Sequence, residues 1–215
     1  MYDSAALSVA RWEGFSRVIK YADVISYLHD DPYDVTPMHH NALTPAGVMM
    51  LWKQVSGQAG GNEFYSNANA FIKVGDSSAS VVGVGQPYDL QGVNVAYAPM
   101  DAGYPVIPGI NSLIPGYSGG SPTGVSYNTC VWQATFGTGL GNGFNWREMG
   151  LDNASSISVP PTPTGPTSQT IPPTQSALPG TGTMFNRIVA PDLTNGWGNK
   201  VAGTIWVAVI VISIS

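Results

Sequence analysis

One short glycine-rich segment has the residue types of an activated serine nucleophile. Residues Gly116–Gly120, with the sequence GYSGG, match the G-x-S-x-G pattern, in which a strand leads into the serine and a helix follows it. Pro115 precedes the segment and Pro122 comes soon after it, so no helix can begin there. A catalytic serine also needs a histidine base, and all three histidines lie within residues 29–40. We therefore interpret the segment as a glycine-rich loop and predict no catalytic residue.

Residue types that bind metals gather in the segment His29–His40. It holds three carboxylates and three imidazoles, which are ligand types found in zinc and calcium sites. No pair of histidines has the HExxH spacing, and Pro32 and Pro37 indicate a turn-rich stretch. We predict a solvated linker here, with no metal and no cofactor.

Glu148 and Arg187 are two of the few charged residues in the second half of the chain. If the strands that carry them are neighbours, their side chains can form a partly buried ion pair, with Trp146 and Trp206 excluding water. Such a pair fixes strand register more reliably than it adds stability. We therefore predict a structural bridge rather than a catalytic pair.

The N-terminal segment has a helical pattern. Apolar residues recur at helical spacing over residues 4–28, with Gly14 as a weak point in the middle. This amphipathic helix is expected either to pack on its own chain or to insert into a neighbouring subunit. In the second case Trp12, Phe15 and Ile19 are the predicted partner contacts.

A second helix is predicted between Thr44 and Gly57. Thr44 suits the N-cap and Pro45 the first helical position. Residues 48–55 form the body, and Gly57 suits the left-handed residue at which the helix ends.

The rest of the chain reads as short strands separated by Gly, Pro, Asn and Asp turns, which indicates a mainly β fold. We predict an antiparallel, jelly-roll-like β-sandwich at residues 58–215, preceded by a helical arm and linker at residues 1–57. The final apolar run is too short to span a membrane, and its alternation predicts a half-buried strand. The predicted strands are 71–74, 93–97, 129–136, 144–151, 184–189 and 204–214.

Residues 158–182 differ in kind from the strands around them. This Pro/Thr-rich insertion has seven prolines and no charge, so it favours extended backbone and cannot form a core. We predict an ordered arm lying on an adjacent subunit. The partner contacts predicted there are Pro160, Pro161, Pro172 and Pro173.

Composition also favours assembly. Only 10% of the 215 residues are charged, while Gly contributes 26 and Pro 17, so part of the surface is expected to be covered by other subunits. A small monomer with an uncharged polar surface is the alternative. The net charge is −5, and no Lys or Arg occurs between Val74 and Trp146. A phosphate backbone needs clustered cations, so we predict no nucleic-acid partner. The single cysteine, Cys130, excludes an internal disulfide framework.

Several segments of the chain resemble one family of proteins. Residues 67–77 (NANAFIKVGDS) are similar to its NANAxIGVGDS segment, and residues 100–105 match its MDAGYP element. Residues 143–151 (GFNWREMGL) and 182–189 (GTMFNRIV) are similar to its FxWxEWGxxN and GGTMLNRKV strands. Residues 204–215 resemble its terminal ATWxLxVxLxxS strand. The family occurs in tailed bacteriophages and includes virion structural proteins.

The resemblance implies a non-enzymatic structural component of a tailed-phage virion, assembled in the cytoplasm of the bacterial host. We expect a capsid decoration (cement) protein that binds the major capsid protein or other virion proteins and forms a homo-oligomer, for which a trimer is plausible. One alternative is a tail, collar or fibre-attachment protein. A second is a carbohydrate- or host-binding β-module, which would display an exposed aromatic platform. No membrane partner is expected.

Overall fold

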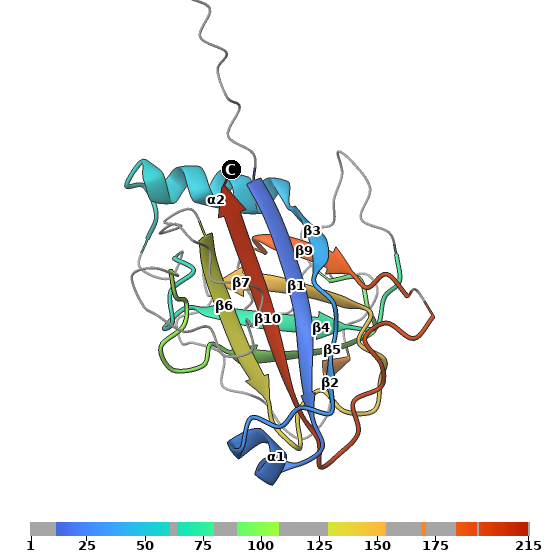
Figure 1. Ribbon diagram of the computed structural model, residues 1–215. Coiled ribbons are helices and arrows are strands. Elements are labelled where there is room, and N and C mark those ends of the chain that lie inside the picture. The colour runs from blue at the N-terminus through green and yellow to red at the C-terminus, as the bar shows by residue number, and fades with distance from the viewer. Residues whose placement is uncertain are drawn as a thin grey trace, which may run out of the picture.

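The computed structural model describes residues 12–60, 64–79, 90–107, 129–153, 169–170, 184–192 and 194–214. Strands dominate this part of the chain, and all of their pairings are antiparallel (Figure 1). The predicted fold class, a mainly β antiparallel sandwich, is confirmed. The elements are β1 (Trp12–Tyr21), α1 (Val24–Leu28), β2 (Asp34–Val35), β3 (His39–Leu43), α2 (Pro45–Val55), β4 (Ala70–Gly75), β5 (Asn94–Pro99), β6 (Thr129–Phe136), β7 (Glu148–Asn153), β8 (Gln169–Thr170), β9 (Asn186–Val189) and β10 (Ile205–Ile214).

The strands form two layers that share one strand. Their order is β6-β10-β1-β3-β9-β7-β4-β5-β8, and β2 pairs with β1 beside this path. Residues 39–41 of β3 pair with β1, whereas Ala42 and Leu43 pair with β9. We call the layer of β6, β10 and β1 sheet A, and the layer of β9, β7, β4, β5 and β8 sheet B. The strands of the two layers cross at a steep angle (Figure 1).

The helix predicted over residues 4–28 is wrong for most of its described part. Trp12–Tyr21 is a strand that pairs with β10 along all ten of its residues. Val18 and Ile19 are both buried and belong to different apolar clusters, so this strand is covered on both faces. Apolar residues on both faces of a strand can mimic helical spacing, and tertiary pairing then decides the structure. Only Val24–Leu28 is helical, behind an Asp23–Ser26 capping box, and residues 4–11 lie outside the described part.

Residues 12–43 are therefore not a separate arm. Both β1 and β3 are hydrogen-bonded into the sheets formed by the later strands, so the boundary predicted at residue 58 divides one hydrogen-bonded unit. The linker predicted around His29–His40 is also partly strand, since β2 and the start of β3 lie there. Of the insertion at 158–182, only β8 is described, and it pairs with the start of β5.

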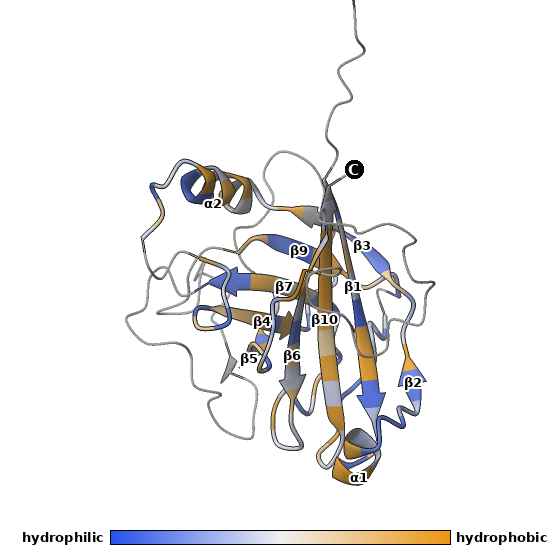
Figure 2. Cartoon of the chain, turned by 60° about the vertical axis from the view of Figure 1, so that its left-hand side comes forward, coloured by the Kyte–Doolittle hydropathy of each residue, from blue (hydrophilic) through white to orange (hydrophobic). Residues whose placement is uncertain are grey.

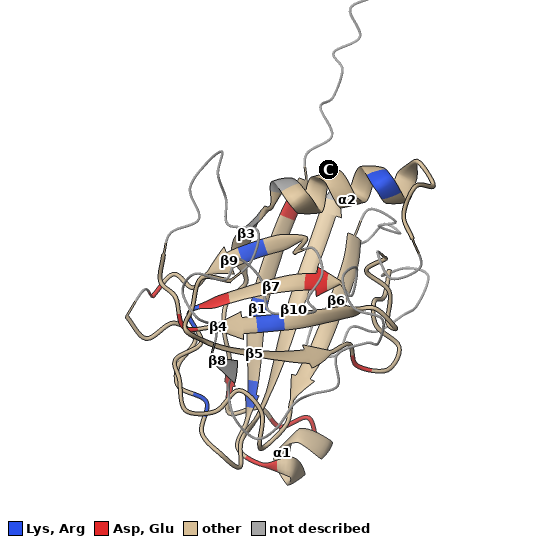
Figure 3. Ribbon diagram, turned by 180° about the vertical axis from the view of Figure 1, so that it is seen from behind, with Lys and Arg blue, Asp and Glu red and all other residues tan. Residues whose placement is uncertain are grey.

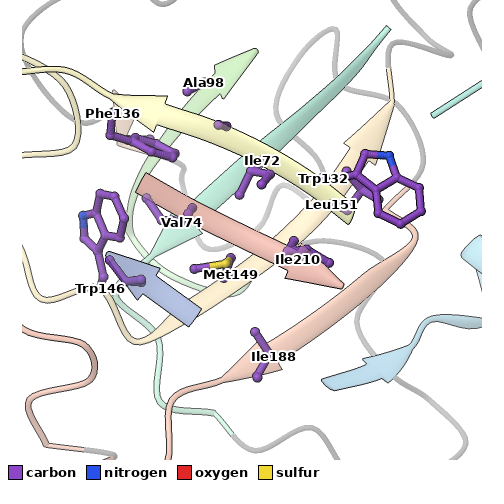
Figure 4. Packing of buried hydrophobic residues seen from close by; sticks show 14 of the residues in the cluster. Ile72, Val74, Ala98, Trp132, Phe136, Trp146, Met149, Leu151, Ile188 and Ile210 are labelled. Carbon is purple, nitrogen blue, oxygen red and sulfur yellow. The ribbon is translucent and has the colours of Figure 1, made fainter. Parts of the chain in front are cut away.

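The main core lies between the two layers. Sheet A contributes side chains such as Trp132, Phe136 and Ile210, and sheet B contributes Met149 and Leu151 (Figure 4). Removing this much apolar surface from water is the main favourable contribution to folding. The cluster therefore fixes how the layers face each other.

The last strand is more deeply buried than its alternating pattern predicts. Trp206, Ala208 and Ile210 face the core between the layers, whereas Val207 and Val209 belong to a second buried cluster on the other face of sheet A. The prediction of a half-buried strand is wrong, because β10 lies between β1 and β6 and both of its faces are covered. Figure 2 shows how apolar this strand is. In the described residues, no helix has the length and apolar character needed to cross a membrane.

The helix predicted after Thr44 is confirmed. The Thr44 side chain accepts a hydrogen bond from the Gly47 N–H, Pro45 is in the first turn, and Gly57 has a φ of 72° just after the Ser56 C-cap. The Thr44 hydroxyl also donates to the Met184 carbonyl oxygen, so the cap ties α2 to the segment that leads into β9.

Replacing Thr44 with Ala is expected to lower the free energy of unfolding by about 0.5–2 kcal/mol, the usual cost of losing an N-cap. The loss should be toward the upper end of that range, because the hydroxyl also serves the Met184 carbonyl. Urea unfolding of both variants provides the check. Thr44→Ser keeps the hydroxyl and should stay close to wild type, so an equal loss in both variants would contradict a hydrogen-bonding role.

Candidate functional site

The outer side of α2 is an exposed apolar surface. Val48, Met49, Trp52 and Val55 lie along it, and the Trp52 side chain is 66% exposed. We call these four residues the α2 surface. Figure 2 shows the helix at one end of the sandwich, beside the end of β10. A row of large apolar side chains exposed on one helix is typical of a protein interaction site.

The inner side of α2 fixes the helix to the sandwich. Met50 is buried in the main core, and Leu51 packs against it. A Cβ at position 47 would overlap the backbone of Phe185, so glycine allows the first turn to lie directly on the segment before β9. The α2 surface is therefore held on a rigid support rather than on a free arm.

A cavity of about 410 Å³ lies beside the helix. Its wall includes Leu51 of α2, Trp12 at the start of β1 and Cys130 near the start of β6, together with Phe64 and Ile107. Burial raises the pKa of the Cys130 thiol to about 11, which keeps it protonated and unreactive at neutral pH. The cavity is thus an apolar hollow that adjoins the α2 surface.

The N-terminal partner contacts predicted from sequence have three different placements. Trp12 is partly exposed, at the rim of the cavity. Phe15 is half-buried, and its ring lies 4.4 Å from that of His40. Ile19 is buried in the second apolar cluster, so it cannot contact a partner, and that prediction is wrong. The other predicted contacts, Pro160, Pro161, Pro172 and Pro173, lie outside the described residues.

A smaller apolar patch lies on α1, at the opposite end of the sandwich from α2 (Figure 1). Val24, Ile25 and Leu28 are exposed there. The helix has only five residues, so this patch is smaller than the α2 surface. The two patches give the molecule an apolar surface at each end.

The ion pair predicted between Glu148 and Arg187 is present. One Arg187 terminal nitrogen lies 2.7 Å from Glu148 Oε2, and both side chains are fully buried. The pairing of β7 with β9 brings the two strands together, as expected. The pair lies on the face of sheet B opposite Met149, which points into the core. Breaking it would leave an uncompensated buried charge.

The Glu148 carboxylate is enclosed by backbone rather than by tryptophans. It accepts hydrogen bonds from the N–H groups of Gln91 and Gly92, the latter at 2.6 Å. A Cβ at Gly75 would lie 2.5 Å from Oε1, so glycine makes room for the carboxylate. Burial raises the pKa of Glu148 above its usual value, and Arg187 and the two N–H groups offset part of that rise.

The tryptophans expected to shield the pair lie elsewhere. Trp146 and Trp206 pack on each other, with ring centroids 5.0 Å apart, and Trp146 also packs on Phe136 in the main core. The prediction that they exclude water from the ion pair is therefore wrong. Trp146 lies just before β7, outside the regular strand, so its side chain can enter the main core although Glu148, two residues later, lies on the other face of sheet B.

A second buried ion pair lies in the same sheet and shares strand β7, and the sequence analysis missed it. Lys73 Nζ of β4 is 2.5 Å from Asp152 Oδ2 of β7, and their side chains are 0% and 1% exposed. Seen from behind, β4 and β9 carry basic residues on either side of the acidic residues of β7 (Figure 3). A lysine inside the otherwise apolar run Ala70–Gly75 was a signal that a buried charge lies there, although it did not identify the partner.

The remaining chemical motifs do not form a site among the described residues. The glycine-rich segment Gly116–Gly120 lies outside them. In the described part of the chain, no three His, Cys, Asp or Glu side chains come close enough to hold a metal ion. Asp34 of the acidic and histidine-rich segment instead pairs with Lys20 at 2.7 Å.

Comparisons of the chain with protein-family models, with curated proteins and with solved structures found no match.

Proposed function

We propose that this protein is a non-enzymatic structural component of a tailed-phage virion. In this proposal it decorates the head shell as a cement protein and uses the α2 surface to bind the major capsid protein or further copies of itself. The observation that carries the proposal is the α2 surface itself, a rigidly supported row of exposed apolar residues on a chain in which only 10% of residues are charged. The sequence resemblance to phage virion proteins is the reason for proposing a virion as its location.

The distribution of tryptophan favours assembly over sugar binding. Of the six tryptophans, Trp132, Trp146, Trp197 and Trp206 are buried, whereas Trp12 and Trp52 are exposed. Trp12 lies at the cavity rim, whose lining includes Leu51 and Phe64, and Trp52 lies on the α2 surface among Val48, Met49 and Val55. Such a mixture suits a protein interface, in which aromatic anchors are surrounded by apolar contacts.

The copy number of the chain in purified particles tests the proposed location. Quantitative mass spectrometry relative to the major capsid protein should give a ratio near one, or a simple fraction such as one third. A handful of copies per particle would instead indicate a tail, collar or fibre position. Absence from the particle would overturn the structural role altogether.

Replacing Trp52 with Glu is expected to weaken binding to shells that lack the protein by about tenfold or more, the effect of removing an interface anchor. The purified variant should fold normally, because substitutions at exposed positions change stability by only about 0.5 kcal/mol. Sedimentation of shells mixed with each variant measures the bound fraction. Leu28→Glu, on the exposed face of α1, is the matched control and should bind like wild type. Loss of binding in the Leu28 variant alone would move the interface to the opposite end.

A further inference from the structure

Lys73 and Asp152 lie close enough to react with each other as well as to form an ion pair. In the register of β4 and β7, Lys73 lies opposite Gly150 and Phe71 lies opposite Asp152. The two charged residues are therefore diagonal neighbours on one face of sheet B. Lys73 Nζ is 2.5 Å from Asp152 Oδ2. Since a carbon–oxygen bond is about 1.2 Å long, Nζ is at most about 3.7 Å from Asp152 Cγ.

The pair is buried, and aromatic rings lie beside it. The Phe71 ring centroid lies 5.7 Å from Lys73 Nζ, and the Tyr97 ring packs on Phe71 at 5.8 Å. Phe71 itself is fully buried. Burial in such a site penalises separate charges. Moving one proton from Nζ to Oδ2 converts the ion pair into a neutral amine beside a neutral carboxylic acid. Burial penalises this neutral pair less than it penalises the two charges.

The other carboxylate oxygen is already held by a donor. The Asn153 N–H donates to Asp152 Oδ1 at 2.7 Å. If an amine attacks Cγ, the negative charge that develops on Oδ1 is stabilised by this N–H, as in an oxyanion hole. Nucleophile, electrophile and oxyanion donor are thus preassembled near the separation of about 3–3.5 Å that suits reaction.

We propose that Lys73 and Asp152 condense into an intramolecular isopeptide bond. After the proton transfer, the Nζ lone pair attacks Cγ and forms a tetrahedral intermediate. The Cγ–Oδ2 bond then breaks, and Oδ2 leaves as water with the protons released by nitrogen. An ammonium and a carboxylate become one amide and one water, so no oxidant, reductant or cofactor is needed.

The bond would join two neighbouring strands of sheet B covalently. It would close a loop that contains everything from Lys73 to Asp152, including β5 and β6. The reaction happens once within the chain and needs only the folded site. It therefore goes beyond the proposed virion role and does not depend on it.

Intact mass spectrometry of the purified folded protein, under denaturing conditions, tests the proposal. The mass should be lower than the sequence mass by one water molecule, about 18 Da. Proteolytic digestion should yield a branched peptide that links the Lys73 and Asp152 segments. A wild-type protein with its full sequence mass would overturn the proposal.

Two lysine variants make the test specific. Lys73→Met removes the nucleophile and should restore the full sequence mass, whereas a persisting loss of water would mean that another reaction had occurred. Lys200→Met is the matched control, because Lys200 is also fully buried, but its Nζ donates to the Gly137 carbonyl and Asn142 Oδ1 at 2.8 Å each. That variant should keep the deficit of one water. The wild-type mass and the branched peptide decide the question even if the Lys73 variant does not fold.

Discussion

Replacing Arg187 with Met is expected to lower the free energy of unfolding by about 3–5 kcal/mol, the usual cost of removing one partner from a buried ion pair. Arg187 and Glu148 are both fully buried, at 2.7 Å from each other. In the variant, the carboxylate keeps only the N–H groups of Gln91 and Gly92. Equilibrium unfolding in urea at neutral pH measures the loss.

The loss should depend on pH in a definite direction. Burial already raises the pKa of Glu148, and Arg187 lowers it, so its removal raises the pKa further. Above the usual glutamate value of about 4.3, the folded variant then binds more protons than the unfolded chain. Its stability therefore rises as the pH falls toward that value. The difference from wild type should therefore shrink as the pH is lowered from neutral toward that value.

A double variant distinguishes the contribution of the two charges to stability from the contribution of side-chain packing. Glu148→Gln with Arg187→Met removes both charges and leaves two groups of similar volume. We expect the double variant to be more stable than Arg187→Met alone by about 0.5–3 kcal/mol, the range of coupling between contacting residues. Additive losses in the two single variants, with no dependence on pH, would mean that the pair contributes packing only.

Most strands from residue 70 onward were predictable because they have strong local signals. β4, β5, β6, β9 and β10 lie within two residues of their predicted bounds at every end. β7 begins at Glu148 rather than at 144, because the residues before it make only an isolated bridge at Asn145. β1 was not predictable locally, since Phe15 and Ile19 fit a helical stripe as well as they fit one face of a strand. Its ten-residue pairing with β10 depends on residues almost 200 positions away.

The candidate sites also divide into those that the sequence could predict and those that it could not. Glu148 and Arg187 could be paired from sequence because they were rare charges in two segments that read as strands. The partner of Lys73 could not be found, because its contact with Asp152 depends on the register of β4 against β7. The α2 surface was also missed. Apolar residues surround that helix, and only its position at the end of the sandwich decides which of them are exposed.

Replacing Trp146 with Ala should destabilise the protein by about 3–5 kcal/mol, as expected for a large side chain removed from a core. Trp146 is fully buried, with its ring 4.6 Å from Phe136 and 5.0 Å from Trp206. Its Nε1 donates to the Gly141 carbonyl at 2.9 Å. Trp146→Phe should lose less, because an aromatic ring still fills much of the space and only the hydrogen bond is removed outright. Urea unfolding of both variants ranks the two effects.

Trp52→Ala is the matched substitution on the surface. We expect it to weaken binding to shells while leaving the stability of the fold nearly unchanged. Because Trp52 is 66% exposed on α2, its loss should change the free energy of unfolding by no more than about 0.5 kcal/mol. Binding to shells should fall in this variant, whereas Trp146→Ala should still bind at a temperature where it remains folded. A folded Trp146 variant that fails to bind, or a Trp52 variant that unfolds early, would mean that the α2 surface and the core are one cooperative element. Separate effects would instead assign one tryptophan to folding and the other to assembly.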